Sequence, residues 1–212
     1  MFESFENLPE EKKKRIIDVC IEEFAEHGYR KGSTNEITKK AGISKGILFH
    51  YFKNKKNLYL YIVDYVVKCF SDILAEQMEM MDSGDIFDMI RDISFIKIKA
   101  FTQAPAMYEF TVNAFLSPPE EIEEDIKKRY FQLYNDNFKL LAQKFDTSKL
   151  RNDIDEKKAI ELLFISLDGI SNKYIKDYKG REKEMINNAD KIMKEFEEYM
   201  HILKVGLYDM GR

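Results

Sequence analysis

Residues 33–59 read STNEITKKAGISKGILFHYFKNKKNLY, and the first part of this stretch predicts a short helix with a defined start and end. Ser33 with Glu36 three residues later is a capping box, in which the serine hydroxyl and the glutamate each satisfy a free backbone N–H. The helix is expected over residues 34–41. Gly42 then ends it, because glycine adopts turn conformations without steric cost.

A second short helix is expected directly after this turn. Ser44 is a suitable N-cap for a helix over residues 45–52, and Asn54 caps a longer helix that begins at Lys55. Two helices of about eight residues, joined by a turn of about four that contains glycine, predict a helix-turn-helix. The second helix of that motif lies in the major groove of DNA.

The chain around this motif supplies a small helical core. Pro9 begins an amphipathic helix that ends at Gly28. Its apolar stripe consists of Ile16, Ile17, Cys20, Ile21 and Phe24. Within the motif and the start of the next helix, six residues are assigned to the same core: Ile37, Ala41, Ile43, Leu48, Phe52 and Leu58.

The composition favours an all-α protein. The 212 residues are 44% apolar and 34% charged, and nine glycines with four prolines are too few for a fold of many short strands. Cys20 and Cys69 lie in apolar helical patterns, so we expect buried thiols in a reducing compartment rather than a disulfide. The first residues have no apolar stretch behind their charges, so we expect no secretory signal, and the most apolar window spans only ten residues. The sequence predicts a cytoplasmic protein with no membrane partner.

Charge is distributed unevenly along the chain. Residues 1–60 carry a net charge of +3 and residues 61–212 a net charge of −7. Between residues 28 and 56, eight Lys or Arg stand against Glu36 alone. Such a basic patch on an acidic chain is typical of a DNA-reading module, although a solvated lysine face would have the same composition.

The sequence of residues 33–59, together with FAEHGY at residues 24–29, resembles the DNA-binding signature of the TetR family of bacterial transcriptional regulators. The resemblance is close over residues 10–60. It implies DNA contacts at Ser33, Lys45, Gly46, Ile47, His50, Tyr51 and Lys55.

The implied roles agree with the chemistry of these residues. The hydroxyl of Ser33, at a helix N-terminus, suits a phosphate. Lys45, Gly46 and Ile47 fall where family members reach base edges. Gly46 permits close approach of the backbone, and Lys45 can donate to guanine or to a phosphate.

His50, Tyr51 and Lys55 correspond to contacts with the sugar-phosphate backbone. The chain departs from the family pattern at two positions. Ile47 stands where many relatives have Thr or Ser, and it could touch a thymine methyl instead. Phe49 stands where they have Tyr, so we expect it to pack rather than to bind. Lys39, Lys40, Lys53 and Lys56 are interpreted as solvated side chains.

The remaining residues predict further helices and no strands. A long helix runs from Lys55 to about residue 81, without a flexible linker, and further helices are expected at 85–103, 105–116, 119–145, 155–178 and 183–208. The predicted fold is all-α. An N-terminal three-helix DNA-binding domain, residues 1–54, is joined by the long helix to a helical effector-binding and dimerisation domain, residues 55–212.

Eleven aromatic residues between positions 85 and 145 suggest an enclosed apolar pocket, although each ring taken singly reads as ordinary core. The resemblance implies a small effector there, and the composition favours an apolar or amphipathic one. The candidate pocket residues are Phe95, Tyr108, Phe115, Tyr134 and Phe164.

The last two long helices predict a homodimer. Each carries an apolar run at helical spacing, one comprising Ile160, Leu163, Phe164, Leu167 and Ile170, the other Ile192, Phe196, Tyr199, Met200 and Leu203. One face can pack inward while another meets a second copy. In the family this pair forms the dimer interface, and a two-fold dimer suits a palindromic double-stranded DNA operator.

The sequence offers no catalytic constellation, cofactor motif or metal site. Its three histidines, His27, His50 and His201, lie in separate predicted helices, and Glu23 with His27 is interpreted as a solvated pair. We therefore expect a ligand-responsive regulator that is not an enzyme, and most simply a repressor that is released from DNA by its effector. The alternative is a helical dimeric sensor or protein-interaction module that binds DNA only non-specifically.

Overall fold

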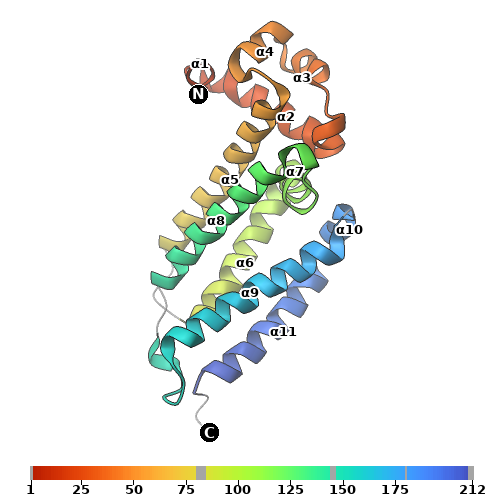
Figure 1. Cartoon of the computed structure of the whole chain (residues 1–212). Helices are drawn as coiled ribbons and strands as arrows, with labels where there is room; N and C mark the ends of the chain where they lie inside the picture. Colours follow the sequence, from red (N-terminus) through yellow and green to blue (C-terminus); the bar gives the residue numbers. More distant parts are fainter. Residues whose placement is uncertain (1, 80–84, 144–146, 180, 210–212) are drawn as a thin grey trace. The chain divides into compact units, whose positions relative to one another are not determined.

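The computed structural model describes residues 2–79, 85–143, 147–179 and 181–209, and leaves out some helical side chains, those of Phe95 and Tyr134 among them. Its helices are α1 (Glu3–Glu6), α2 (Glu10–Lys31), α3 (Thr34–Ala41), α4 (Lys45–Phe52), α5 (Lys55–Glu79), α6 (Ile86–Gln103), α7 (Pro105–Leu116), η1 (Glu120–Ile122), α8 (Glu123–Gln143), η2 (Thr147–Lys149), α9 (Glu156–Tyr178), α10 (Glu182–Asn187) and α11 (Ala189–Leu207) (Figure 1). The all-α prediction is confirmed. Within the described residues, no helix is both long and apolar enough to cross a membrane.

Most predicted helix boundaries agree with the structure to within a residue or two. α2 continues three residues past its predicted end at Gly28, although Gly28 itself has non-helical backbone angles, and the helix expected from residue 119 begins as η1 and becomes α-helical at Glu123. The expected helix ends near residue 81 and at residue 145 lie outside the described residues. The last helix differs most. A single helix was expected over residues 183–208, and the structure divides it into α10 and α11 at Asn188. The Asn188 side chain donates to the Glu184 carbonyl oxygen at 2.8 Å, and its backbone N–H also turns back to α10. This local competition with the helical hydrogen bonds explains the break.

The described chain forms two compact units. The first comprises Met1–Ser71 and Phe101–Tyr130, and the second comprises Asp72–Ala100 and Phe131–Arg212. These units are defined by how the chain packs. The predicted functional domains, residues 1–54 and 55–212, divide the chain at a different place, and that division stays a prediction.

The first unit has one hydrophobic core, to which α1 to α5, α7, η1 and the start of α8 all contribute. Five of the six residues assigned to this core from the sequence are fully buried, namely Ile37, Ala41, Leu48, Phe52 and Leu58, whereas Ile43 is only partly buried. Cys20 is buried as expected, but Cys69 is only half-buried. The helix-turn-helix therefore rests on a packed base that includes α7.

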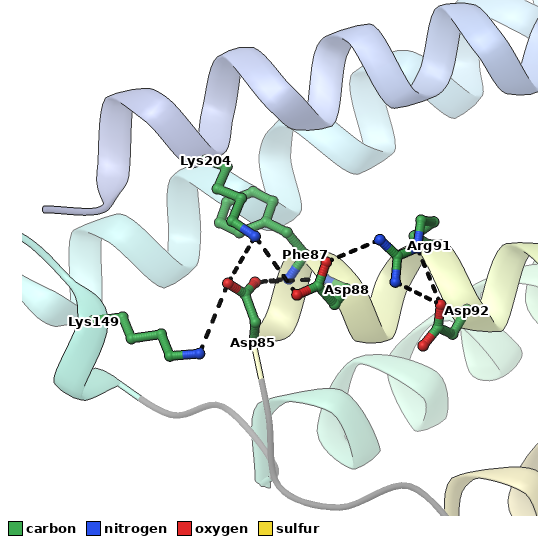
Figure 2. Close-up of polar contacts among 7 residues, drawn as sticks. All are labelled: Asp85, Phe87, Asp88, Arg91, Asp92, Lys149 and Lys204. Atoms are coloured by element: carbon green, nitrogen blue, oxygen red, sulfur yellow. Dashed lines mark hydrogen bonds and ion pairs between the residues drawn. The ribbon is translucent and has the colours of Figure 1, made fainter. Parts of the chain in front are cut away.

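The second unit joins α6, α9 and α11 through a core that contains Leu163 and Met200. Figure 2 shows the polar contacts at the start of α6. Asp85 is 8% exposed, and its carboxylate accepts the Phe87 N–H at 2.9 Å and faces the Lys204 ammonium at 2.9 Å. Lys149 lies 4.0 Å from the same carboxylate. A buried carboxylate that caps one helix and pairs with a lysine on another fixes the end of α11 against α6.

Candidate nucleic-acid interface

The two helices of the motif begin and end where local hydrogen bonding places their boundaries. Ser33 Oγ accepts the Glu36 N–H at 3.3 Å, and Ser44 Oγ accepts the Ile47 N–H at 3.2 Å. Between the helices, Gly42 adopts the left-handed conformation (φ 66°, ψ 37°), and the Ile43 N–H donates to the Thr38 carbonyl oxygen. Positive φ at this position favours glycine, which explains why the turn forms there.

The exposed side of α4 carries the residues expected to read DNA. Lys45, Gly46 and His50 are exposed, and Ile47 is 39% exposed, a high value for such an apolar side chain. Phe49 is half-buried, with the Lys45 ammonium 5.9 Å from its ring centre. The start of α4 thus presents a cation, an open backbone position and a methyl-bearing side chain to the surroundings.

The capping box at Ser33 is only half as predicted. Ser33 does cap α3, but its own N–H donates to Glu23 Oε1 at 2.8 Å, where the sequence suggested Glu36. Glu23 is 2% exposed, so its interpretation as part of a solvated pair with His27 was wrong. Glu23 is buried together with the apolar side of α2, and the non-helical backbone at Gly28 lets the following chain bring the Ser33 N–H to its carboxylate.

Lys55 is less free than the sequence suggests. Its Nζ donates to the Arg30 carbonyl oxygen at 3.0 Å and lies 5.2 Å from the centre of the Tyr29 ring. Burial lowers the pKa of the Lys55 ammonium below its ordinary value, and the Glu23 carboxylate offsets part of this change. Because an ammonium has three donors, Lys55 can still offer a hydrogen bond to a phosphate.

Tyr51 is supported by a helix that the sequence reasoning missed. Phe5 of α1 is fully buried, and its ring centre lies 5.5 Å from that of Tyr51 and 4.7 Å from that of Phe52. The recurrence of apolar residues at Phe2, Phe5 and Leu8 was the signal that could have revealed this helix. Tyr51 is half-buried as a result, with its position set by the packing beneath it.

Two cations of the basic patch are engaged in ion pairs within the first unit. Arg30 donates to both carboxylate oxygens of Glu121, with a shortest distance of 3.0 Å, and Lys56 lies 2.7 Å from Asp125. Hydrogen bonding from these cations holds the pKa of Glu121 and of Asp125 below its ordinary value. The charge available for DNA is therefore smaller than the sequence count of this patch.

The residues suggested for an effector pocket have different surroundings. The side chains of Phe95 and Tyr134 lie outside the described residues. Tyr108 and Phe115 belong to α7 in the first unit, where burial raises the pKa of Tyr108 and Phe115 packs against the core. Phe164 is buried in the second unit. Their role in effector binding stays a prediction.

The apolar runs of the last two long helices face mainly inward. Leu163, Phe164 and Met200 are buried. Five other members of the two runs pack around the second core, namely Leu167, Ile170, Phe196, Tyr199 and Leu203. A different set of apolar side chains is exposed on the same helices, consisting of Leu162, Ile165, Ile202 and Val205. If α9 and α11 meet a second copy, this exposed set is the surface that the structure offers.

Acidic, histidine and cysteine side chains do not cluster as metal ligands in the described part of the chain, where no group of three or more lies together.

A helix-turn-helix with an exposed recognition helix, followed by a second helical unit, is typical of DNA-binding transcriptional regulators.

Comparison with known families agrees with this class. Residues 16–62 match the model described as "Bacterial regulatory proteins, tetR family", and residues 84–208 match "Tetracyclin repressor-like, C-terminal domain". The second match alone covers more than half of the chain. The chain belongs to the TetR family and is a transcriptional regulator with a DNA-binding and a ligand-binding domain.

Sequence identity with individual relatives is low. The biofilm operon icaADBC negative transcriptional regulator IcaR of Staphylococcus aureus (strain Newman) is 26% identical over 163 residues, which cover 72% of this chain and 80% of IcaR. A TetR family transcriptional regulator from Chloroflexus aurantiacus J-10-fl has a TM-score of 0.54 at 25% identity, with 98% of each chain covered. FadR from Bacillus subtilis, solved with stearoyl-CoA, has a TM-score of 0.59 at 15% identity, with 85% of this chain and 95% of FadR covered. The FadR similarity shows the fold alone.

Proposed function

We propose that this protein is a homodimeric repressor that binds a palindromic operator and releases it when a small apolar or amphipathic effector binds. The observation that carries the proposal is the start of α4, where Lys45, Gly46 and Ile47 are exposed above a fully packed core. Residues at the N-terminal end of a recognition helix are those that reach base edges. IcaR, named as a negative regulator, supports repression rather than activation.

The exposed apolar set on α9 and α11 supports the dimer. Four large apolar side chains on two helices of one unit, with exposures from 36% to 69%, form a surface that a second copy can cover. A two-fold dimer presents two recognition helices, and their half-sites would lie one helical turn, about 34 Å, or a multiple of it apart. A monomer would present one.

An amphipathic effector fits both the composition and a structural relative. Residues 85–145 contain eleven aromatic side chains, and FadR, whose fold this chain shares, was solved with stearoyl-CoA. Release requires the effector to bind the DNA-free conformation more tightly. A tenfold loss of DNA affinity needs about 1.4 kcal/mol of such coupling.

The DNA-binding proposal is tested by selection from a random-sequence library of duplexes, followed by fluorescence anisotropy on the selected duplex and on a shuffled version. We expect an enriched inverted repeat that is bound in preference to the shuffled duplex at moderate salt. Equal, weak and strongly salt-dependent binding to both duplexes would instead support a sensor or interaction module that holds DNA only by charge.

The dimer is tested by light scattering at micromolar concentration. Ile165→Glu places a charge in the exposed apolar set and should give a monomeric mass with much weaker operator binding. The control is Phe131→Glu, because Phe131 is 66% exposed on α8, outside this set. A wild-type protein that is monomeric would refute the proposed dimer.

The effector class is tested with stearoyl-CoA and with coenzyme A as the matched control. Stearoyl-CoA should raise the unfolding temperature and displace the protein from the selected duplex, since a ligand that binds only the folded state stabilises it. Coenzyme A alone should do neither. Displacement by both would show that the acyl chain is unimportant and would contradict an amphipathic effector.

A further inference from the structure

A buried carboxylate lies beneath the turn that leads into α3. Glu23 projects from α2 and is 2% exposed. Its Oε1 accepts the Ser33 N–H at 2.8 Å, and its Oε2 lies 3.7 Å from Lys40 Nζ on α3. His27 Nε2 lies 4.0 Å from Oε1. Glu23 therefore links α2 to both ends of α3, through the backbone at its start and through a lysine near its end.

Stability alone does not account for a carboxylate at this position. Removing an ionised group from water is costly, and a well-packed apolar side chain in place of a buried ion pair is often neutral or stabilising. Glu23 makes one charge-assisted hydrogen bond at good distance and a looser ion pair. What this arrangement does provide is a fixed position for the Ser33 backbone.

The chain around Ser33 leaves little freedom for any other placement. Gly28 interrupts α2 with φ 65°, and the Gly32 N–H donates to the Gly28 carbonyl oxygen at 3.0 Å. At Gly32 a Cβ atom would lie 2.6 Å from Cδ1 of Phe24, so the backbone there packs directly on the fully buried ring. Close packing at Gly32 and the hydrogen bond at Ser33 together hold the start of α3 against α2.

We propose that Glu23 is a positioning residue for DNA binding, which holds Ser33 and the N-terminus of α3 where they receive a DNA phosphate. Glu23 itself does not touch DNA. It uses the Ser33 backbone N–H and leaves the Ser33 hydroxyl, whose oxygen already caps α3, able to donate its proton to a phosphate. The inference rests on the proposed operator binding and names a residue on which that binding depends.

The test compares three variants in anisotropy titrations with the duplex that the wild type selects. Glu23→Gln keeps an oxygen that can accept the Ser33 N–H and should bind within about threefold of the wild type. Glu23→Leu fills the site without an acceptor, so it leaves the Ser33 N–H unpaired and should lose about tenfold in affinity, with a lower unfolding temperature. Glu22→Leu, at the exposed neighbouring position, is the control and should bind as the wild type does.

A second comparison keeps the proposal testable if Glu23→Leu does not fold. Glu23→Asp retains the charge but shortens the side chain by one methylene, so it should bind the duplex less tightly than Glu23→Gln. The reverse order would show that charge matters rather than the hydrogen bond to Ser33, and would overturn the proposal.

A double-mutant cycle with Ser33→Ala separates positioning from a merely structural role. If Glu23 acts through Ser33, the loss in the double variant Glu23→Leu with Ser33→Ala is smaller than the product of the single losses. Losses that multiply, or a Glu23→Leu protein that binds as the wild type does, overturn the role of Glu23 alone. A wild-type protein that enriches no duplex overturns operator binding itself.

Discussion

Gly46 offers a variant in which stability and DNA affinity should change in opposite directions. Gly46 lies in the first turn of α4 and is exposed, and a Cβ atom added there would meet nothing closer than Ser44 Oγ at 3.9 Å. Gly46→Ala therefore introduces no clash within the protein. Because alanine loses less backbone entropy than glycine on folding, we expect a gain of about 0.5–1 kcal/mol. In a chain of this length that gain raises the unfolding temperature by roughly 1–4 °C.

The same methyl group should weaken operator binding. If the backbone at Gly46 approaches a base or sugar directly, the added Cβ keeps the recognition helix away from the groove. We expect at least a tenfold loss on the selected duplex, equivalent to about 1.4 kcal/mol, and a smaller loss on shuffled DNA. Thermal unfolding followed by circular dichroism gives the stability change, and fluorescence anisotropy at several salt concentrations gives both affinities.

Two outcomes would contradict a close approach of Gly46 to the bases. A Gly46→Ala protein that is more stable and binds the selected duplex as tightly as the wild type would remove Gly46 from the close contacts with DNA. A loss of equal size on the selected and shuffled duplexes would assign Gly46 to backbone binding rather than to base recognition.

Four further variants test the same unit. Gly32→Ala should lower the free energy of unfolding by about 1–3 kcal/mol, because the new Cβ overlaps the Phe24 ring; an unchanged unfolding temperature would contradict this packing. Lys53→Gly should stabilise the protein by about 1 kcal/mol in denaturant unfolding, since Lys53 has φ 67° in a γ-turn and glycine relieves that strain; a loss of stability would show that the lysine side chain outweighs it. Lys45→Ala should reduce affinity for the selected duplex more than for shuffled DNA, whereas Tyr51→Ala should reduce both alike, and equal specificity ratios in Lys45→Ala and the wild type would exclude Lys45 from base readout.

The helix-turn-helix was predictable because its signals are local. The Ser33 hydroxyl bonds an N–H three residues away, and Ser44 does the same at the next helix. Gly42 sets the turn by its own conformation. Hydrogen bonds that span three or four residues need no knowledge of the rest of the fold, so the bounds of α3 and α4 could be read directly from the sequence.

The features that the sequence reasoning missed depend on distant partners. Glu23 looks like an ordinary surface residue until Ser33, ten positions later, folds back onto it. The position of Lys55 depends on the carbonyl oxygen of Arg30, 25 residues earlier. Phe5 belongs to a four-residue helix that is too short to be stable alone, and it forms because aromatic rings from α4 and α5 cover it.

The sequence by itself determined the all-helical class, the positions of most helices and the family. The periodic spacing of apolar residues, the helix caps and the turns all depend on residues that are close together in the sequence. Only the tertiary structure decided which charged groups are free to meet DNA and which apolar side chains of α9 and α11 stay exposed. Leu163 and Ile165 are chemically similar and two positions apart, yet the first is fully buried and the second is 69% exposed. Burial is a property of the whole packed arrangement, since it depends on which surfaces the other helices cover.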